Sequence, residues 1–427
     1  MPASDPVVPA PVSDSTAAAP ASASALPNAR AAPRGLAPLL AALAAIGPFS
    51  IDTYLPAFPA IGKALAATPV EVQQTLTAYL LPFAFMMLWH GALSDALGRR
   101  RVLLWAYALY AASSLFCVFA TSIEMLWLGR GLQGISAGAG MVVGRAIVRD
   151  VLDGPAAQRL MAHIGMMFAI APAVAPVLGG WVHAFFDWHA VFVFLALYGA
   201  VLFAAIWRYL PETLPAEARQ SLRAGPLLRA YGEVFSHRGF FALAGALALN
   251  FNGFFIYVLS APAFLIGHLG VSPQGFLWLF GPAMAGMIAG NYLSARLAGR
   301  VSSQRTIALG YAVMIAAAVA NIVLNLALAP RLPWSVLPVA LYVVGLALAM
   351  PSLSLRVLDL FPQRRGLISS CQGVLFTGVN ALTAAVLAPL AWDSTLTLAL
   401  AMAAFMLLGL AAFSVQLGDC PAARRRG

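Results

Sequence analysis

Long apolar stretches recur along the whole chain, and short polar or charged segments separate them. A helix that crosses the hydrocarbon core of a bilayer needs about 20 mostly apolar residues, because its backbone polar groups must all be satisfied within the segment. Twelve stretches fit this length. We expect spans at 35–60, 72–93, 102–122, 124–148, 160–183, 188–210, 239–263, 274–298, 305–328, 334–357, 366–390 and 394–416.

The longest internal polar interval, 211–238, divides the expected spans into two sets of six. The pattern predicts an all-α polytopic membrane protein with an N-terminal six-helix bundle over 35–210 and a C-terminal one over 239–416. The interval between them is expected to be a cytoplasmic linker. Segments 1–34 and 417–427 are expected to be tails, the first disordered because Ala, Pro and Ser dominate it. Two related halves place a binding site near the membrane midplane between them.

Composition and charge support the membrane class. The chain is 61% hydrophobic with a mean hydropathy of +0.85, above the roughly 45–50% apolar content of soluble domains. The net charge of +10 is unevenly distributed, since 22 of the 25 basic residues fall in alternate connections or in the tails. Basic residues concentrate in cytoplasmic loops, so both termini are expected to be cytoplasmic, and the charge indicates orientation rather than a nucleic-acid surface.

Several activities lack their sequence signals. No GxxxxGK[ST] loop is present, which argues against ATP-driven transport by this chain. The six histidines are scattered without an HExxH pattern or a cysteine pairing, and no nucleophilic triad is suggested. We therefore expect no enzyme activity, no metal and no cofactor, with a proton gradient as the energy source.

Two ionisable residues lie deep within expected spans, Asp52 in FSIDTYLPAFPAI and Arg130 in LGRGLQGISAGAG. A charge inside the bilayer costs roughly 2.5–3.5 kcal/mol on insertion scales, so each is a candidate functional group. Counting about 1.5 Å per helical residue from the span ends places them at similar depth. They could therefore pair or share a water and couple proton movement to another solute. The alternative is a static ion pair that only fixes helix packing.

Polar and aromatic residues in other spans suggest a cavity for an amphiphilic solute. Gln133 lies one turn after Arg130 and could equally form an interhelical hydrogen bond, while the nearby Gly134 and Gly138 favour close helix packing. An aromatic patch at helical spacing can also be lipid-facing or core. The predicted cavity residues are Tyr54, Gln133, Asn250, Asn252, Phe255, Tyr257, Gln372 and Asn380.

The run GALSDALGRRRVLL, between the second and third spans, concentrates charge in a chain where only 9% of residues are charged. Gly91 and Gly98 permit a tight turn, Asp95 can cap a helix or bind an arginine, and Arg99 and Arg100 favour the inner face. We predict a cytoplasmic gate here. A solvated loop that merely carries positive charge is the alternative.

The fifth span contains MFAIAPAVAPVLGGW, with Pro172, Pro176, Gly179 and Gly180. Proline removes a backbone hydrogen bond, and glycine lets another backbone approach closely. This span is therefore expected to be kinked and pliable. An ordinary transmembrane proline kink is the alternative.

These motifs resemble those of the major facilitator superfamily and, more narrowly, of twelve-span drug:proton antiporters of the Bcr/CflA type, over residues 36–416. The resemblance implies that Asp52 takes part in proton and substrate coupling and that Arg130 assists the proton relay. It also implies that Asp95 and Arg99 belong to an inner gate that latches the halves. APAVAPVLGGW departs from the general antiporter motif, because Ala175 stands where glycine is usual before the proline, and this variant is similar to Bcr-type sequences.

The expected function is proton-coupled export of amphiphilic drug-like compounds by alternating access. The expected location is a bacterial inner membrane, where the chain acts as a monomer whose partners are the small-molecule substrate, protons and the lipid bilayer. A proton symporter that imports a metabolite, or a non-transporting sensor of the same fold, are the alternatives. The substrate itself cannot be read from the sequence, because one fold serves many solutes.

Overall fold

The computed structural model describes residues 35–152, 154–219, 224–361 and 365–418. The predicted tail 1–34 and most of the tail 417–427 lie outside these residues. The described elements are α1 (Leu36–Asp52), η1 (Leu55–Ala57), α2 (Phe58–Ala64), α3 (Pro69–Leu97), α4 (Arg99–Val118), α5 (Ile123–Ala137), α6 (Ala139–Val151), α7 (Gly154–Phe185), α8 (His189–Tyr209), η2 (Ala216–Ala218), α9 (Ala224–Phe235), α10 (Arg238–Leu259), η3 (Pro262–His268), η4 (Pro273–Phe276), α11 (Leu277–Leu297), α12 (Ser303–Ala327), α13 (Leu337–Asp359), α14 (Arg365–Leu382), η6 (Thr383–Leu387), α15 (Ala388–Ala391) and α16 (Thr395–Gly418).

The predicted all-α membrane class is confirmed. Within the described residues, eleven helical segments are long and apolar enough to cross a bilayer, and α7 adds a shorter apolar stretch, Ile170–Phe185. Together they correspond to the twelve predicted spans. Side chains such as Trp105, Phe185 and Trp207 are largely exposed, as expected for surfaces that contact lipid rather than water.

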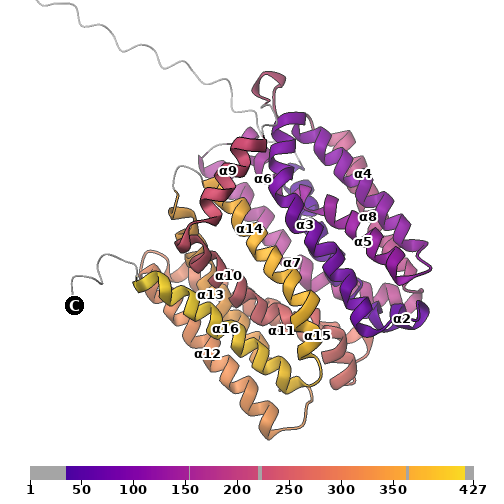
Figure 1. Ribbon diagram of the computed structural model, residues 1–427, viewed down its shortest axis with the longest axis vertical. Helices are drawn as coiled ribbons and strands as arrows, with labels where there is room; N and C mark the ends of the chain where they lie inside the picture. The colour runs from indigo at the N-terminus through magenta and orange to yellow at the C-terminus, as the bar shows by residue number, and fades with distance from the viewer. Residues whose placement is uncertain (1–34, 153, 220–223, 362–364, 419–427) are drawn as a thin grey trace, which may run out of the picture.

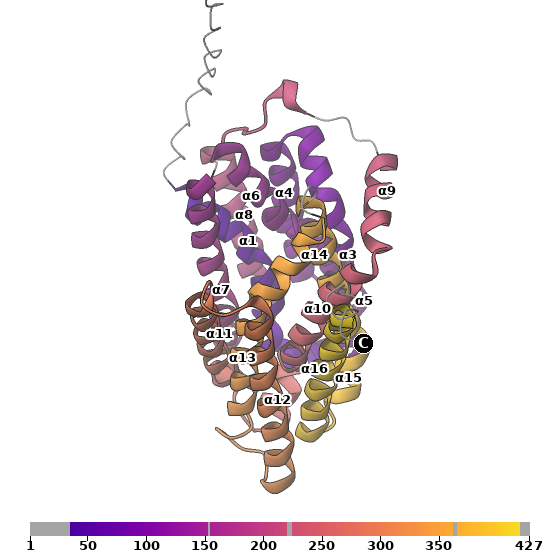
Figure 2. The same cartoon turned by 90° about the vertical axis from the view of Figure 1, so that its left-hand side faces the viewer.

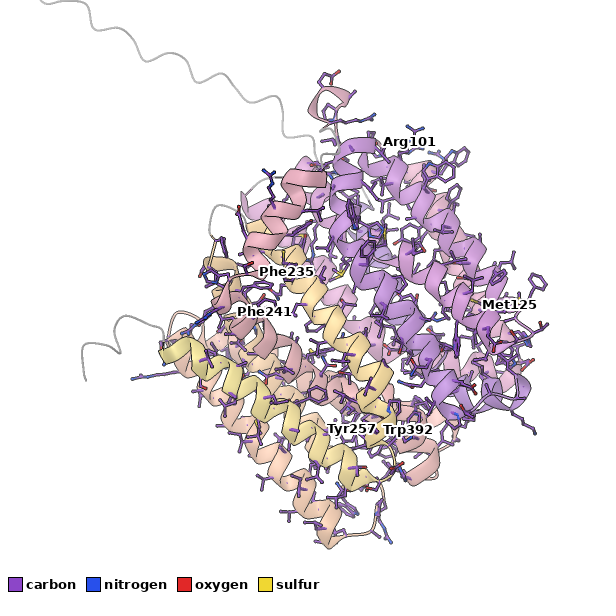
Figure 3. The ribbon with its side chains drawn as sticks, in the orientation of Figure 1. Arg101, Met125, Phe235, Phe241, Tyr257 and Trp392 are labelled. Atoms are coloured by element: carbon purple, nitrogen blue, oxygen red, sulfur yellow. The ribbon has the colours of Figure 1, made fainter. Side chains whose placement is uncertain are left out.

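The helices form two groups, which we call the first half (α1–α8) and the second half (α10–α16) (Figure 1). In the first half α1 packs on α7, α3 on α5, and α4 on α8; in the second half α13 packs on α11 and α12, and α10 on α16. The end that carries the turn between α3 and α4 is called here the basic end. Arg101 marks that end, and Trp392 lies near the other one (Figure 3).

The first predicted span contains a break that the hydrophobic pattern does not show. Helix α1 ends at Asp52, and the chain continues through η1 into α2. Pro56 causes this, because it has no N–H to donate to the carbonyl of Asp52 and disfavours helical geometry at Leu55. The fourth span is likewise divided into α5 and α6 at Gly138, which fits the low helix propensity of glycine.

The interval predicted as a linker includes a helix, α9. Its Val234 is fully buried, and the Tyr231 hydroxyl donates a 3.0 Å hydrogen bond to the carbonyl of Leu88 in α3. Burial raises the pKa of Tyr231 to about 12, so its hydroxyl stays a neutral donor. Phe235 packs against Phe241 at the start of α10 (Figure 3). The linker therefore holds to both halves instead of running freely between them.

Two helices carry much of the contact between the halves. Helix α14 lies along α3, and α7 contacts η4 and α11; Figure 2 shows α14 between α3 and α13. The Gln74 amide donates to the carbonyl of Ala385 over 2.9 Å, and Arg145 donates to the Ser369 hydroxyl over 3.3 Å. The halves thus touch at both ends of α14.

The contact between α5 and α3 depends on a glycine. A Cβ at Gly134 would overlap the carbonyl oxygen of Tyr79, whereas a Cβ at Gly131, one turn earlier, would lie 3.6 Å from the carbonyl oxygen of Ala78. Gly134→Ala is therefore expected to destabilise the protein by about 1–3 kcal/mol through overpacking. Thermal unfolding followed by size-exclusion chromatography measures this, with Gly131→Ala as the matched control. Equal stability of the two variants would contradict the close approach.

Candidate functional site

Arg130 is fully buried in α5, and its described hydrogen bonds and ring contacts link it to uncharged groups. Its Nη1 donates to Gln133 Oε1 at 2.5 Å, and its Nη2 donates to the carbonyl of Ser50 at 2.9 Å. The guanidinium carbon lies 4.5 Å from the ring centroids of both Tyr54 and Tyr79. Cation–π contacts of this kind contribute about 0.5–2 kcal/mol each. The charge is therefore held between two aromatic rings and two neutral acceptors.

The position of Ser50 explains why its carbonyl is available. The last four carbonyls of a helix lack intrahelical partners, and α1 ends at Asp52. The network continues beyond these partners. The Gln133 amide donates a 2.7 Å hydrogen bond to the Ser114 hydroxyl, and the hydroxyls of Tyr54 and Thr75 share a hydrogen bond of 2.6 Å. Arg130 thus joins α1, α3, α4 and α5.

Asp52 does not form an ion pair with Arg130. Its residue is 4% exposed, and its Oδ1 is buried with no hydrogen-bond partner among the described residues. Arg130 bonds the backbone carbonyl of Ser50, and this contact does not involve the carboxylate of Asp52 two residues later. Asp52 follows Ser50 by two residues, but the predicted pairing with Arg130 is not present in this structure.

The predicted pliable helix lies directly beside Asp52. A Cβ at Gly179 would overlap the carbonyl of Thr53, the residue after Asp52, and a Cβ at Gly180 would press on the carbonyl of Pro273 in η4. Pro176 is buried and Pro172 is half-buried. Two adjacent glycines therefore place α7 between the end of α1 in the first half and η4 in the second.

At the basic end, Arg99 organises a cluster of carboxylates. Its Nη1 lies 2.5 Å from Asp95 Oδ1, and its Nε donates to Asp150 Oδ2 at 3.0 Å. Its backbone N–H donates to Glu212 Oε1 at 2.9 Å, which places a carboxylate at the N-terminus of α4, where the helix dipole favours it. We call these residues the Arg99 cluster.

Other residues of the predicted gate shape the same turn. Gly98 has a φ of 99°, a backbone conformation that side chains other than glycine rarely adopt. Arg100 donates to the carbonyl of Trp207 at the end of α8 over 2.6 Å, and Gly91 faces Val142 in α6 at ordinary contact distance. All these contacts, and the side-chain contacts of Arg99, stay within the first half, while the backbone N–H of Arg99 reaches Glu212 in the segment that follows α8. The implied latch between halves is not formed by them here.

Part of the predicted cavity set meets on one face of α10. Asn252 donates to Asn380 Oδ1 in α14 at 2.8 Å, and its own Oδ1 has no partner among the described residues. Phe255 stacks on Phe251, and Phe251 packs against Phe376 in α14 with centroids 4.6 Å apart. We call these five residues the α10–α14 pocket face. This face combines an amide oxygen that lacks a hydrogen-bond partner with the aromatic surface of the phenylalanines.

Other members of the set are used elsewhere. Asn250 donates to the Tyr311 hydroxyl at 2.7 Å, and Asn321 donates to the Tyr257 hydroxyl at 2.8 Å. Asn250 and Tyr257, the two predicted cavity residues among these, lie on the face of α10 opposite to Asn252 and Phe255. We therefore assign them to the packing of the second half rather than to a cavity. Gln372 is half-buried, and its amide lies 3.4 Å from the Ser354 hydroxyl in α13.

Sequence reasoning missed several partners at both sites. Tyr79 and Ser50 gave no signal, because an aromatic or a serine in an apolar span is common. Asp150 and Glu212 each follow a predicted span, and a search for acidic residues near the arginine-rich turn would have found them. Among the residues with described structure, no three His, Cys, Asp or Glu side chains gather as metal ligands do.

Comparison with known proteins gives consistent results. Residues 40–384 match the profile of the Major Facilitator Superfamily. The chain is 34% identical to the uncharacterized MFS-type transporter YdgK of Bacillus subtilis over 80% of this chain and 85% of that protein. It is 26% identical to the bicyclomycin resistance protein homolog of Haemophilus influenzae, over 88% and 94% of the two chains.

A solved structure supports the fold. The bacterial homolog of the human lysosomal transporter Spinster, in an inward-facing and unoccupied conformation, superposes with a TM-score of 0.66 at 16% identity and covers 92% of this chain and 97% of its own. These matches confirm the resemblance inferred from the sequence motifs.

The Arg99 cluster should stabilise the first half measurably. Arg99→Gln leaves the Asp95 and Asp150 carboxylates without their cation, and hydrogen bonds to charged groups contribute about 1.5–3 kcal/mol. We expect a lower unfolding temperature for the purified protein, with the exposed Arg101→Gln as control for loss of one positive charge. A lower unfolding temperature in Arg101→Gln alone, or in neither variant, would contradict this assignment.

Proposed function

Because this chain belongs to the major facilitator superfamily, with sequence motifs of the Bcr/CflA type, we propose that it is a proton-coupled antiporter that exports amphiphilic drug-like compounds. The observation that carries the proposal is the difference between the two buried ionisable groups. Neutral hydrogen-bond acceptors and two aromatic rings compensate the charge of Arg130, whose Nε has no partner in the part of the chain that the structure describes. The Asp52 carboxylate takes no part in this, and its Oδ1 is buried without a hydrogen-bond partner among the described residues. The relative named for bicyclomycin resistance supports a drug as the substrate class.

Asp52 is suited to carry the proton. A carboxylate in a low-dielectric site is costly unless it is hydrated, paired or protonated. Since Arg130 does not neutralise it, the protonation state of Asp52 depends on whether water reaches it. A permanent ion pair would lack this sensitivity.

The surroundings of Asp52 link its hydration to the positions of the halves. Helix α7 lies against Thr53 through Gly179 and against η4 of the second half through Gly180. A rocking motion of one half against the other changes these contacts, and with them the access of water to Asp52. Proton release and the change of access are thereby joined in one motion.

The α10–α14 pocket face is the proposed substrate wall. Its phenylalanines supply apolar contact, and the free Asn252 Oδ1 supplies a hydrogen-bond acceptor. Apolar walls with few polar groups are typical of sites for amphiphilic small molecules. Across from it, Met87 of α3 contacts Thr377, so the wall faces the first half.

The proposal is tested by replacing Asp52 with asparagine, which keeps the shape and removes the titration. We measure drug accumulation in bacteria that lack their own exporters, at equal protein level, with and without a protonophore. Wild type should lower accumulation, and both Asp52→Asn and the protonophore should abolish this difference. The control is Asp393→Asn, an exposed aspartate in the loop before α16, which should export like wild type.

Two results would change the conclusion. If Asp52→Asn still exports drug, this residue does not couple export to protons. If wild type leaves a broad panel of compounds unmoved, uptake by symport or a sensing role replaces drug export, and the direction of flux against an imposed pH gradient separates those two.

We also propose that the basic end faces the cytoplasm, because the excess of Arg residues lies there. In a variant whose three cysteines are alanine, Asp393→Cys and Gln304→Cys introduce thiols at exposed positions of opposite ends. A membrane-impermeant maleimide applied to intact cells should label the thiol at 393 and spare the thiol at 304 until the cells are opened. The reverse labelling pattern would invert the orientation.

A further inference from the structure

A crevice of about 460 Å³ lies between the halves at the end opposite the basic end. Phe58 and Val72 line it from the first half, and Leu259, Ile266 and Trp392 line it from the second. Trp392 marks this end in Figure 3. The volume is within the range of roughly 300–1,000 Å³ that small-molecule sites occupy.

Two polar residues make the crevice more than an apolar groove. Lys63, the only lysine of the chain, lies exposed along its lining. Gln73 also lines it, is fully buried, and has neither its Nε2 nor its Oε1 hydrogen-bonded among the described residues. No acidic residue is among the lining residues.

These features specify the chemistry of an occupant. A buried amide without partners costs about 1–3 kcal/mol, which a ligand that bonds it recovers. The ammonium of Lys63, with no acidic residue in the lining, favours an anion. The walls favour an apolar body. A carboxylate accepts hydrogen bonds from both an ammonium and an amide N–H, so one headgroup satisfies both residues.

We propose that this crevice is a second binding site, for a small single-chain amphiphilic carboxylate. Its headgroup lies toward Lys63 and Gln73, and its tail lies along the apolar walls. The site is separate from the α10–α14 pocket face, and the inference does not depend on drug export. Because both halves supply walls, an occupant stabilises the present arrangement of the halves and slows any transport that separates them.

Binding is tested on the purified full-length protein in phosphatidylcholine nanodiscs with dansyl-labelled undecanoate, followed by fluorescence. Lys63→Gln should weaken binding about tenfold, the loss of one charge-assisted contact. Lys63→Arg should retain binding, and Gln73→Leu should weaken it. The matched control is Arg331→Gln, which removes the other basic residue expected at this end and should change nothing. The uncharged carboxamide of the probe should bind wild type and Lys63→Gln equally.

Several results would overturn the proposal. Equal binding by wild type and Lys63→Gln would do so, as would an equal loss in Arg331→Gln, which would indicate bulk charge attraction. If phosphatidylglycerol in the nanodisc abolishes probe binding, the crevice takes a lipid headgroup instead. A diazirine analogue of the carboxylate should crosslink to peptides containing residues 58–73 or 259–267, and labelling confined to α14 would place the ligand elsewhere.

Discussion

The buried guanidinium of Arg130 is the constraint on which the first half depends. A charge in a dry interior must be compensated, and removing its partners leaves a desolvation cost of several kcal/mol. The protein compensates it with a carbonyl of α1, an amide of α5, a ring of α3 and the ring of Tyr54, just after α1. This solution requires α1 to end where it does, since only a helix end offers the free carbonyl of Ser50.

Neutral compensation has a consequence for Asp52. Had the carboxylate served as the counter-ion, its charge would be fixed by Arg130 in every conformation in which the pair persists. Here neutral groups compensate the charge of Arg130 without it, and the Asp52 side chain keeps an unpartnered oxygen beside the junction of α1 and α7. The glycines at 179 and 180 complete this arrangement, because any side chain there would separate α7 from the backbone on one side or the other.

The sequence predicted the spans and the ionisable groups because both depend on the bilayer: apolar length and the cost of buried charge are local properties of the chain. It could not predict which groups meet. Asp52 and Arg130 have matching depth, but Arg130 bonds the backbone carbonyl of Ser50 and the side chain of Gln133 in place of the Asp52 carboxylate. Asn250 and Asn252 looked equivalent in sequence, yet they lie on different faces of α10. The helix α9 was missed because its amphipathic pattern is short and flanked by charges.

Polar contacts inside the first half are stronger than the polar contacts between the two halves. Charge-assisted bonds of the Arg99 cluster join α3, α4 and α6 to one another and to Glu212 in the segment that follows α8. Across the interface, the described polar contacts include an amide to a carbonyl at Gln74 and a long bond from Arg145 to a serine hydroxyl. The Gln74 bond is neutral, and such bonds contribute only about 0.5–1.5 kcal/mol each; the Arg145 bond has a charged donor but is long, at 3.3 Å. Weak contacts between the halves and strong contacts within one of them fit the proposed alternating access, which requires one half to move against the other while each retains its own packing.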